Sequence, residues 1–345
     1  MTTQRNAATH IPNGREPPAS PAPGAGRRRR TLGAAVLGVA ALATVIALLA
    51  AVGVFNGNAA PLTNCAAKPS TCSYPDATNT GVPAGTTLKQ VPSQVSSGPG
   101  WSYNAAGKTV TVTVKGTVLS GLYIPYNLVI NASNVTVKNV QVVTGGNFGI
   151  SLTHTKGVTI ENSTISGTNA TSGRVAYAID DVYADSTGMT IKANDISAFR
   201  TGIQISTGLA QGNYLHDPGF VAGDHTNGFY VNGGTQPLTI TGNTIFDSLG
   251  QTDAINLDAG TPGPSAPVAN KSVTNNFLSG GSYTIYAGAA SGSPTSKIVI
   301  TGNRFGQHYY AKSGQYGPVA YFGAGTGNAW SGNIWDTTGQ AISAP

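Results

Sequence analysis

Charged residues, cysteines and the residues typical of helical bundles are scarce in this chain of 345 residues. Only 9% of the residues are charged, which excludes a disordered polyelectrolyte. The low content of Leu, Glu and Lys excludes a helical bundle. Gly is abundant, with 46 copies, and Thr, Ser, Asn, Val and Ile are frequent. These residue types favour strands and turns, so the composition indicates an all-β protein.

Basic character is confined to the N-terminal end of the chain. The formal net charge is +6, but residues 1–31 hold six of the 19 basic residues and one of the 13 acidic ones. Without them, 13 basic and 12 acidic residues remain, a net charge of +1. A nearly neutral body offers no surface for phosphate groups, so no nucleic-acid partner is expected.

A single long apolar run, Leu32–Phe55, contains no charged residue. As a helix, its 24 residues would extend about 36 Å, enough to cross a hydrocarbon layer about 30 Å thick. Arg27–Arg30 precede the run and should stay in the cytoplasm, which places everything after Phe55 outside the cell. We therefore expect a single-pass membrane protein with its C-terminal domain outside. The alternative is cleavage near Asn58–Ala60 and secretion.

The chain has two cysteines, Cys65 and Cys72, which lie just beyond the apolar run. Their spacing fits no zinc motif, and no further cysteine could complete one. An oxidising exterior favours a disulfide between them. No H-E-x-x-H, G-x-S-x-G or P-loop motif occurs either.

Short repeats dominate the rest of the sequence. A five-residue segment recurs at intervals of 24 to 30 residues, and its third residue is always apolar: Phe148–Leu152, Tyr177–Asp181, Thr201–Ile205, Asn227–Val231, Asp253–Leu257 and Tyr283–Ala287. A second strand-like segment lies between several copies and leads into a turn with a recurring asparagine: Asn194, Asn213, Asn243, Asn276, Asn303 and Asn333. Asparagine tolerates left-handed backbone angles and can hydrogen-bond its neighbours in a stack. The pattern predicts a β-solenoid whose coils pair at about 4.8 Å.

These repeats resemble the right-handed parallel β-helix, or pectate-lyase-like, superfamily. The stretch Thr80–Leu88 resembles the opening segment of secreted actinobacterial β-helix proteins, and their His-x-Asp-Gly turn reads His225-Thr226-Asn227-Gly228 here. The resemblance covers residues 74–340. It implies a right-handed parallel β-helix, and the change to strand periodicity at Lys108 places this domain over residues 108–345. Composition and the apolar run predict what precedes it: a disordered basic cytoplasmic tail (1–31), a transmembrane helix or signal anchor (32–55), and a linker with an N-terminal cap (56–107). The superfamily contains lyases, hydrolases, epimerases and non-enzymes, so the resemblance implies no single activity.

The residue after each inward apolar position should point outward and stack from coil to coil. This predicts one ladder of Ser151, Asp180, Gln204, Tyr230, Asn256 and Tyr286, and a second ladder two residues later that includes Asn232 and Asp258. Such a mixture of carboxylates, amides and rings suits a carbohydrate, since acids and amides bind hydroxyl groups and rings cover the apolar sugar face. We take Gln204, Tyr230, Asn232, Asn256, Asp258 and Tyr286 as candidate substrate-binding residues. The alternative is an ordinary solvated sheet face.

Asp181 falls where the other repeats place an inward apolar residue. One interpretation is a bulge that turns Asp180 and Asp181 outward and gives the core position to Val182. Two outward carboxylates would suit a general acid/base pair, or Ca²⁺ as a cofactor. The other interpretation is a buried acid at Asp181, with a raised pKa.

Arg200, His225 and Asp253 lie in the turns that lead into the central strands. With Asp180 and Asp181 they are the candidate catalytic residues. His225 could act as a base, and Arg200 could neutralise a uronate carboxylate. The residue set of polygalacturonases is incomplete, since only the double Asp is present.

Three functions therefore stay open. The first is a polysaccharide lyase or glycoside hydrolase acting on an acidic polysaccharide, the second is a non-catalytic carbohydrate-binding protein, and the third is a structural cell-surface protein.

Overall fold

The computed structural model describes residues 65–258 and 267–344. The predicted cytoplasmic tail and the predicted membrane segment Leu32–Phe55 lie outside the described residues. Within the described ranges, no helix is long and apolar enough to cross a membrane. The two helices found there are short 3-10 turns, η2 (Pro69–Cys72) and η3 (Ala290–Gly292).

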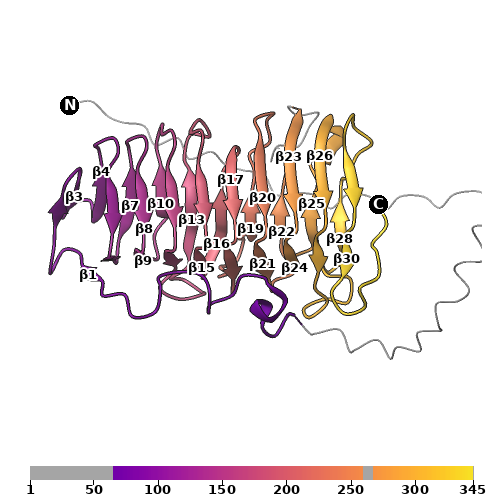
Figure 1. Cartoon of the computed structure of the whole chain (residues 1–345), viewed down its shortest axis with the longest axis horizontal. Coiled ribbons are helices and arrows are strands. Elements are labelled where there is room, and N and C mark those ends of the chain that lie inside the picture. Colours follow the sequence, from indigo (N-terminus) through magenta and orange to yellow (C-terminus); the bar gives the residue numbers. More distant parts are fainter. Residues whose placement is uncertain (1–64, 259–266, 345) are drawn as a thin grey trace, which may run out of the picture. The chain divides into compact units, whose positions relative to one another are not determined.

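Three sheets run the length of the described domain (Figure 1). Sheet A consists of β1 (Lys89–Gln90), β6 (Leu122–Ile124), β9 (Gln141–Val143), β12 (Thr164–Ser166), β15 (Asp195–Ser197), β18 (Tyr214–His216), β21 (Thr244–Asp247), β24 (Phe277–Gly280), β27 (Arg304–Phe305) and β30 (Ile334–Trp335). Sheet B consists of β2 (Ser97–Gly98), β3 (Trp101–Asn104), β4 (Thr109–Val112), β7 (Asn127–Ile130), β10 (Phe148–Leu152), β13 (Val175–Asp181), β16 (Phe199–Gln204), β19 (Asn227–Tyr230), β22 (Asp253–Asn256), β25 (Tyr283–Tyr286) and β28 (Gly317–Ala320). Sheet C consists of β5 (Val118–Ser120), β8 (Thr136–Lys138), β11 (Thr159–Glu161), β14 (Thr190–Lys192), β17 (Gly208–Gln211), β20 (Leu238–Thr241), β23 (Val268–Thr274), β26 (Thr295–Thr301) and β29 (Ala329–Ser331).

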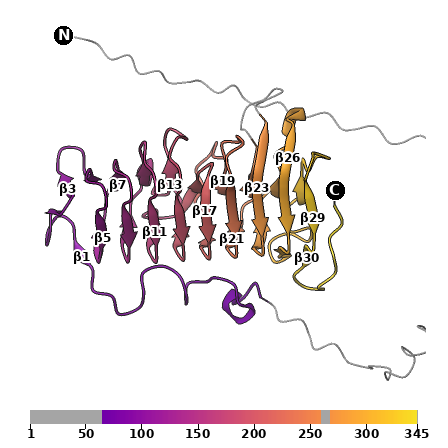
Figure 2. The same ribbon diagram turned by 45° about the horizontal axis from the view of Figure 1, so that its top comes forward.

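Each coil passes through sheets B, C and A in that order, and each strand then pairs with the equivalent strand of the next coil (Figure 2). The paired strands are parallel from β4 onward. The exceptions are β2 with β3 and β3 with β4, which pair antiparallel at the N-terminal end. The predicted parallel β-solenoid is therefore confirmed.

The recurring apolar residue forms the predicted inward stack. Ile150, Ile179, Ile203, Phe229 and Ile255 are direct register partners in successive strands of sheet B, and all are buried. The stack continues through Leu128 at one end and Ile285 at the other. Burial of this row, rather than any local propensity, fixes the register, because a one-residue slip would turn the apolar set toward solvent.

The recurring asparagines occupy the turn between sheets C and A, where they form a buried hydrogen-bonded ladder. The side-chain Nδ2 of Asn243 donates to Oδ1 of Asn276 at 2.9 Å and to the carbonyl of Ala210 at 3.1 Å. Its Oδ1 accepts from the backbone N–H and Nδ2 of Asn213, both at 2.9 Å. The left-handed backbone lies one residue earlier, for example at Gly242 and Asn275. The predicted stacking of asparagines is confirmed, but the left-handed angle belongs to the residue before each ladder asparagine.

Residues 65–88, which we call the N-terminal strap, lie along the outer side of sheet A (Figure 1). Tyr74 contacts Phe277 of β24 with ring centroids 5.3 Å apart. Further along, the backbone N–H of Gly81 donates to the carbonyl of Ala193 at 3.0 Å. The strap thus runs back from the later coils to the earlier ones before β1 joins sheet A. The described part of the predicted linker is packed, and β1, β2 and β3 form the N-terminal cap.

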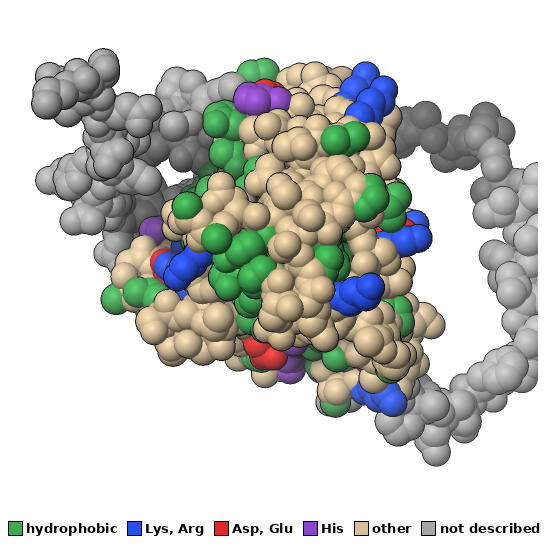
Figure 3. All heavy atoms as spheres, turned by 90° about the vertical axis from the view of Figure 1, so that its left-hand side faces the viewer, with side chains coloured by type: hydrophobic (Ala, Val, Ile, Leu, Met, Phe, Trp, Pro, Cys, Tyr) green, Lys and Arg blue, Asp and Glu red, His purple; other side chains and the backbone are tan. Residues whose placement is uncertain are grey.

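The predicted disulfide between Cys65 and Cys72 is present at the start of the strap. Cys65 is buried against Phe246 and Phe277, so the bonded loop holds the strap on the outer side of sheet A. The view onto the end of the solenoid where the cap lies shows hydrophobic side chains near the centre and scattered charges toward the edges (Figure 3).

Candidate functional site

The outer face of sheet B carries the first predicted ladder. Ser151, Asp180, Gln204, Tyr230, Asn256 and Tyr286 are register partners in consecutive strands from β10 to β25. Their order along the solenoid axis is the one expected from the repeats. Side chains from residues more than 100 positions apart in the sequence are therefore placed on one face.

A second row, of which the sequence analysis singled out only Asp253, runs beside the first. It consists of Phe148, Tyr177, Thr201, Asn227 and Asp253, two residues before each inward apolar position. The residue between the row and the core is Gly or Ala. A Cβ at Gly149 would lie 2.8 Å from the Ile165 side chain, so this position faces inward as well. The Gly or Ala residue and the apolar residue after it therefore both face the core. The residue before this pair, which belongs to the second row, is left on the outer side of the sheet.

The recurring small residue was the available signal for this row. Gly149, Ala178, Gly202, Gly228 and Ala254 precede the apolar residue in successive repeats. At Gly202 a Cβ would come within 2.8 Å of Leu215, and at Gly228 within 2.3 Å of Ile245. Strict alternation would place this residue on the solvent side, but its close approach to sheet A shows that it belongs to the core.

The polar groups on this face are recessed. Asp180 is 4% exposed, Asp258 is 8% exposed, and Asp253 is fully buried. One carboxylate oxygen of each is buried and has no hydrogen-bond partner among the described residues. Such buried, unpaired acceptors are costly unless the carboxyl group is protonated.

Asp253, Asn256 and Asp258 form a connected group on one coil. Nδ2 of Asn256 donates to the Asp253 carboxylate at 2.8 Å, and Oδ1 of Asn256 accepts from the backbone N–H of Asp258 at 2.9 Å. Burial raises the pKa of Asp253 well above its usual range and raises that of Asp258 to about 6. Asp253 therefore orients the Asn256 amide, while Asp258 retains a small exposed surface.

Asp180 lies three strands away from this group, next to the Arg200 guanidinium. Burial raises the pKa of Asp180 to about 7, the Asp181 carboxylate raises it further, and Arg200 opposes both. The guanidinium carbon of Arg200 lies 4.4 Å from the centroid of the Tyr177 ring, in a cation–π contact. A carboxyl group with this pKa exchanges its proton near neutral pH.

Asp181 does not share the outer face with Asp180. It pairs in register with the core residue Leu152, is buried, and accepts hydrogen bonds from the backbone N–H of Ser186. Val182 is 39% exposed, so the predicted bulge with Val182 in the core was wrong. The alternative of a buried acid is confirmed. Burial raises the pKa of Asp181, and the hydrogen bonds from Ser186 offset part of this effect. Within residues 65–258 and 267–344, no group of three or more acidic, His or Cys side chains could hold a metal ion.

His225 lies at the border of the face and is exposed. Its Nδ1 is 3.4 Å from the Thr252 hydroxyl on the adjoining turn. The neighbouring Asp224 is paired with Arg174, and this ion pair holds the pKa of Asp224 below its usual range despite burial. In the second predicted ladder, Asn232 is exposed and accepts a hydrogen bond from Nε2 of Gln204 at 3.3 Å.

A group of tyrosines continues the face toward the C-terminal coils. The Tyr286 ring lies 5.7 Å from Tyr283 and 5.6 Å from Tyr321, and Tyr283 lies 5.9 Å from Tyr316. Tyr316 and Tyr321 are 59% and 47% exposed. The sequence analysis found Tyr286 and missed the other three, because they lie outside the repeated segment or at its edge.

The family comparison agrees with this architecture. Residues 96–248 match the family model of the right-handed beta helix region. The described domain is a parallel β-helix, and its residues 96–248 are similar to the right-handed β-helix family. No curated protein matches it, and no solved structure does.

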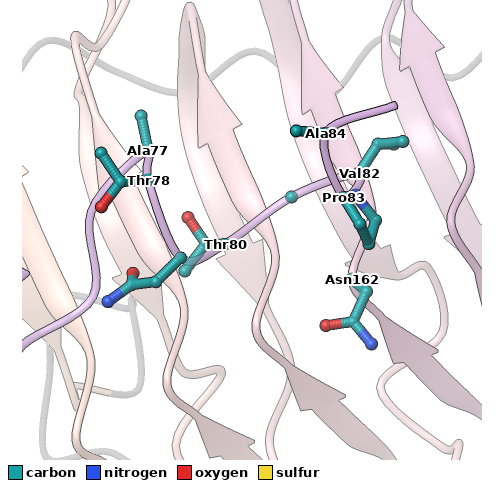
Figure 4. Close-up of a pocket in the computed structure, with 9 residues that line it drawn as sticks. Ala77, Thr78, Thr80, Val82, Pro83, Ala84 and Asn162 are labelled. Carbon is teal, nitrogen blue, oxygen red and sulfur yellow. The ribbon is translucent and has the colours of Figure 1, made fainter. Parts of the chain in front are cut away.

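The β-helix also has a hollow on another side, between the N-terminal strap and the turn after β11 (Figure 4). It is lined by Ala77–Ala84 of the strap and by Asn162. None of these lining residues is charged or nucleophilic apart from the threonine hydroxyls, so the hollow offers no group for acid–base chemistry. The outer face of sheet B is therefore the candidate site of the β-helix.

Proposed function

We propose that the outer face of sheet B binds a polysaccharide chain. The observation that carries the proposal is the arrangement on one face: recessed carboxyl and amide groups lie in the central coils, with aromatic rings on both sides along the axis. Phe148 and Tyr177 stack at 5.9 Å on one side, and the Tyr286 group lies on the other. Rings suit the apolar faces of sugars, and amide and carboxyl groups suit their hydroxyl groups.

Cleavage of the bound chain is a second candidate function, and Asp180 favours it. Its carboxyl group has a pKa of about 7 and a position in the row of outward residues. A carboxylic acid that is partly protonated at neutral pH can give its proton to a leaving glycosidic oxygen. Asp180 and Asp258 are three strand spacings apart, about 14 Å, which is too far for the two-carboxylate arrangement of glycosidases. His225 is the candidate base, and Asp181 and Asp253 are buried supporting acids.

A glycan array followed by product analysis tests both functions. We expect Tyr230→Ala to reduce glycan affinity about 2- to 10-fold, as expected for the loss of one ring contact. Asp180→Asn and His225→Ala should leave binding in place and abolish any cleavage. Tyr123→Ala on β6 of sheet A is the matched control, because it removes a half-buried tyrosine from a different face.

Two results would contradict the proposal. If neither Tyr230→Ala nor His225→Ala alters any glycan interaction, the face is an ordinary solvated sheet and the structural interpretation stands. If Tyr123→Ala is as harmful as Tyr230→Ala, the effect reflects general loosening of the solenoid.

A further inference from the structure

We propose that Asn232 is a site of spontaneous deamidation, where the chain converts one of its own amide groups to a carboxyl group without an enzyme. The proposal is independent of the proposed function, because the reaction uses only the backbone of the chain and water. It rests on the contrast between the two Asn-Gly pairs of the described residues, Asn227-Gly228 and Asn232-Gly233.

The reaction joins the two residues of an Asn-Gly pair in a ring. The backbone nitrogen of Gly233 gives its proton to a solvent base and attacks Cγ of Asn232, which forms an N–Cγ bond and closes a succinimide. The Cγ–Nδ2 bond breaks, and Nδ2 takes up a proton and leaves as ammonia. Water then opens the ring at either carbonyl and yields aspartate or isoaspartate. Glycine suits the second position because it has no Cβ to hinder the attack.

The reacting groups of the second pair are not held in place. Asn232 lies two residues after the end of β19 and is exposed. Its Oδ1 accepts a hydrogen bond from Nε2 of Gln204 at 3.3 Å. Within residues 65–258 and 267–344, no group accepts a hydrogen bond from Nδ2 of Asn232 or from the backbone N–H of Gly233. Neither the leaving group nor the attacking nitrogen must therefore give up such a bond to react.

Two successive glycines allow the turn to reach the geometry of the reaction. Gly233 and Gly234 have φ values of +66° and +78°, and a Cβ built on Gly234 would meet nothing within 4 Å. Gly233 is buried in this conformation, so its nitrogen must become accessible by rotation of the turn. Glycine changes its backbone angles at little steric cost, and a local opening of an irregular segment costs far less than global unfolding.

The same dipeptide at Asn227-Gly228 is locked within β19. Asn227 is 7% exposed, and its Nδ2 donates to the carbonyl of His225 at 3.1 Å. A Cβ on Gly228 would lie 2.3 Å from the Ile245 side chain and 2.7 Å from the carbonyl oxygen of Ala254. Ring closure here would require the strand to leave both the sheet and the core. The fold therefore protects Asn227 and leaves Asn232 reactive.

Deamidation at this position changes the charge of the candidate site. It replaces the exposed amide next to Gln204 with a carboxylate, and isoaspartate also adds a methylene group to the main chain just after β19. The equivalent position on the next coil is already an acid, Asp258, because Tyr230 and Asn256 are register partners. The outer face of sheet B thus becomes more acidic as the protein ages.

The test is incubation of the full chain in a mild detergent at pH 6, 7 and 8, followed by chymotryptic peptide mapping. Cleavage after Tyr230 places the two asparagines in different peptides. We expect the Asn232 peptide to convert to aspartate and isoaspartate forms, faster at pH 8 than at pH 6 because the attacking nitrogen must lose its proton. Asn227 should keep its amide. Both asparagines should convert in guanidinium chloride, where the fold no longer distinguishes them.

Two variants identify the site. Asn232→Gln should remove the acidic species from isoelectric focusing of the folded protein, because the longer side chain closes a larger and less favourable ring. Asn232→Asp should focus with the converted protein and serves as the charge reference. Conversion of Asn232 only in guanidinium chloride would overturn the proposal. Equal conversion of Asn227 and Asn232 in the folded protein would overturn it as well, since the fold would then protect neither.

Discussion

Buried carboxyl groups in the candidate site make the stability of the fold depend on pH. The pKa of Asp180 is about 7 in the folded protein against 3.8 for an unperturbed group, because burial disfavours the charged form. Below about pH 4 the group is protonated in both states and costs nothing. Between about pH 4 and 7 the group is ionised in the unfolded chain but still protonated in the folded protein. The free energy of unfolding therefore falls as the pH rises through this range, and above about pH 7 the destabilisation by Asp180 is complete.

Asp180→Asn should therefore raise the melting temperature relative to the unmodified protein at pH 8, by a margin that shrinks as the pH falls toward 4. Thermal melts at pH 4, 6 and 8 measure this margin. Asp76→Asn is the control of opposite sign, since hydrogen bonds from Ser70 and Thr78 outweigh burial and lower the pKa of Asp76 to about 2. It should destabilise the protein at neutral pH, and the gap should close as pH falls from about 4 to 2. A pH-independent margin for Asp180→Asn would contradict the burial of its charge.

The turns between sheets C and A depend on the asparagine ladder. Each ladder asparagine satisfies buried backbone and side-chain groups of two neighbouring coils, as Asn243 does for Asn213 and Asn276. These groups have no access to water, so their hydrogen bonds are expensive to leave unmade.

Asn243→Ala should lower the free energy of unfolding by about 3 kcal/mol or more, since several buried groups lose their partners at once. Urea unfolding followed by circular dichroism gives the value. The matched change Asn275→Gly, one coil later, replaces a residue whose φ is +55° and should be neutral or slightly stabilising. If both variants behaved alike, the ladder would contribute no more than the turn shape does.

The whole molecule combines the described β-helix with an N-terminal sequence that predicts a membrane anchor. This prediction rests on the uncharged run Leu32–Phe55, which follows four consecutive arginines. We expect the protein to fractionate with membranes and to resist extraction by high salt or carbonate. External protease should digest the exposed chain while leaving an N-terminal epitope tag protected. A mature chain that begins near Pro61 and accumulates in the medium would instead indicate cleavage and secretion.

Periodic and local features were determined by the sequence alone. The spacing of Ile179, Ile203 and Phe229 identified the coils, because a solenoid repeats the same burial at each turn and repetition is visible without coordinates. The disulfide between Cys65 and Cys72 needed only two nearby cysteines. The outward row from Ser151 to Tyr286 followed from alternation within one strand.

Features that depend on other parts of the chain were decided only by the tertiary structure. The close approach of sheet A turns Gly149 and its equivalents inward, which places Phe148 and Tyr177 on the outer face. Asp181 is buried because the turn that follows it supplies backbone donors, a contact that no repeat encodes. The strap lies on sheet A through contacts such as Tyr74 with Phe277, about 200 residues apart in sequence and in a segment without periodicity. Side chains brought together by coiling leave no pattern within a single repeat, and this is the physical reason that the sequence alone did not reveal them.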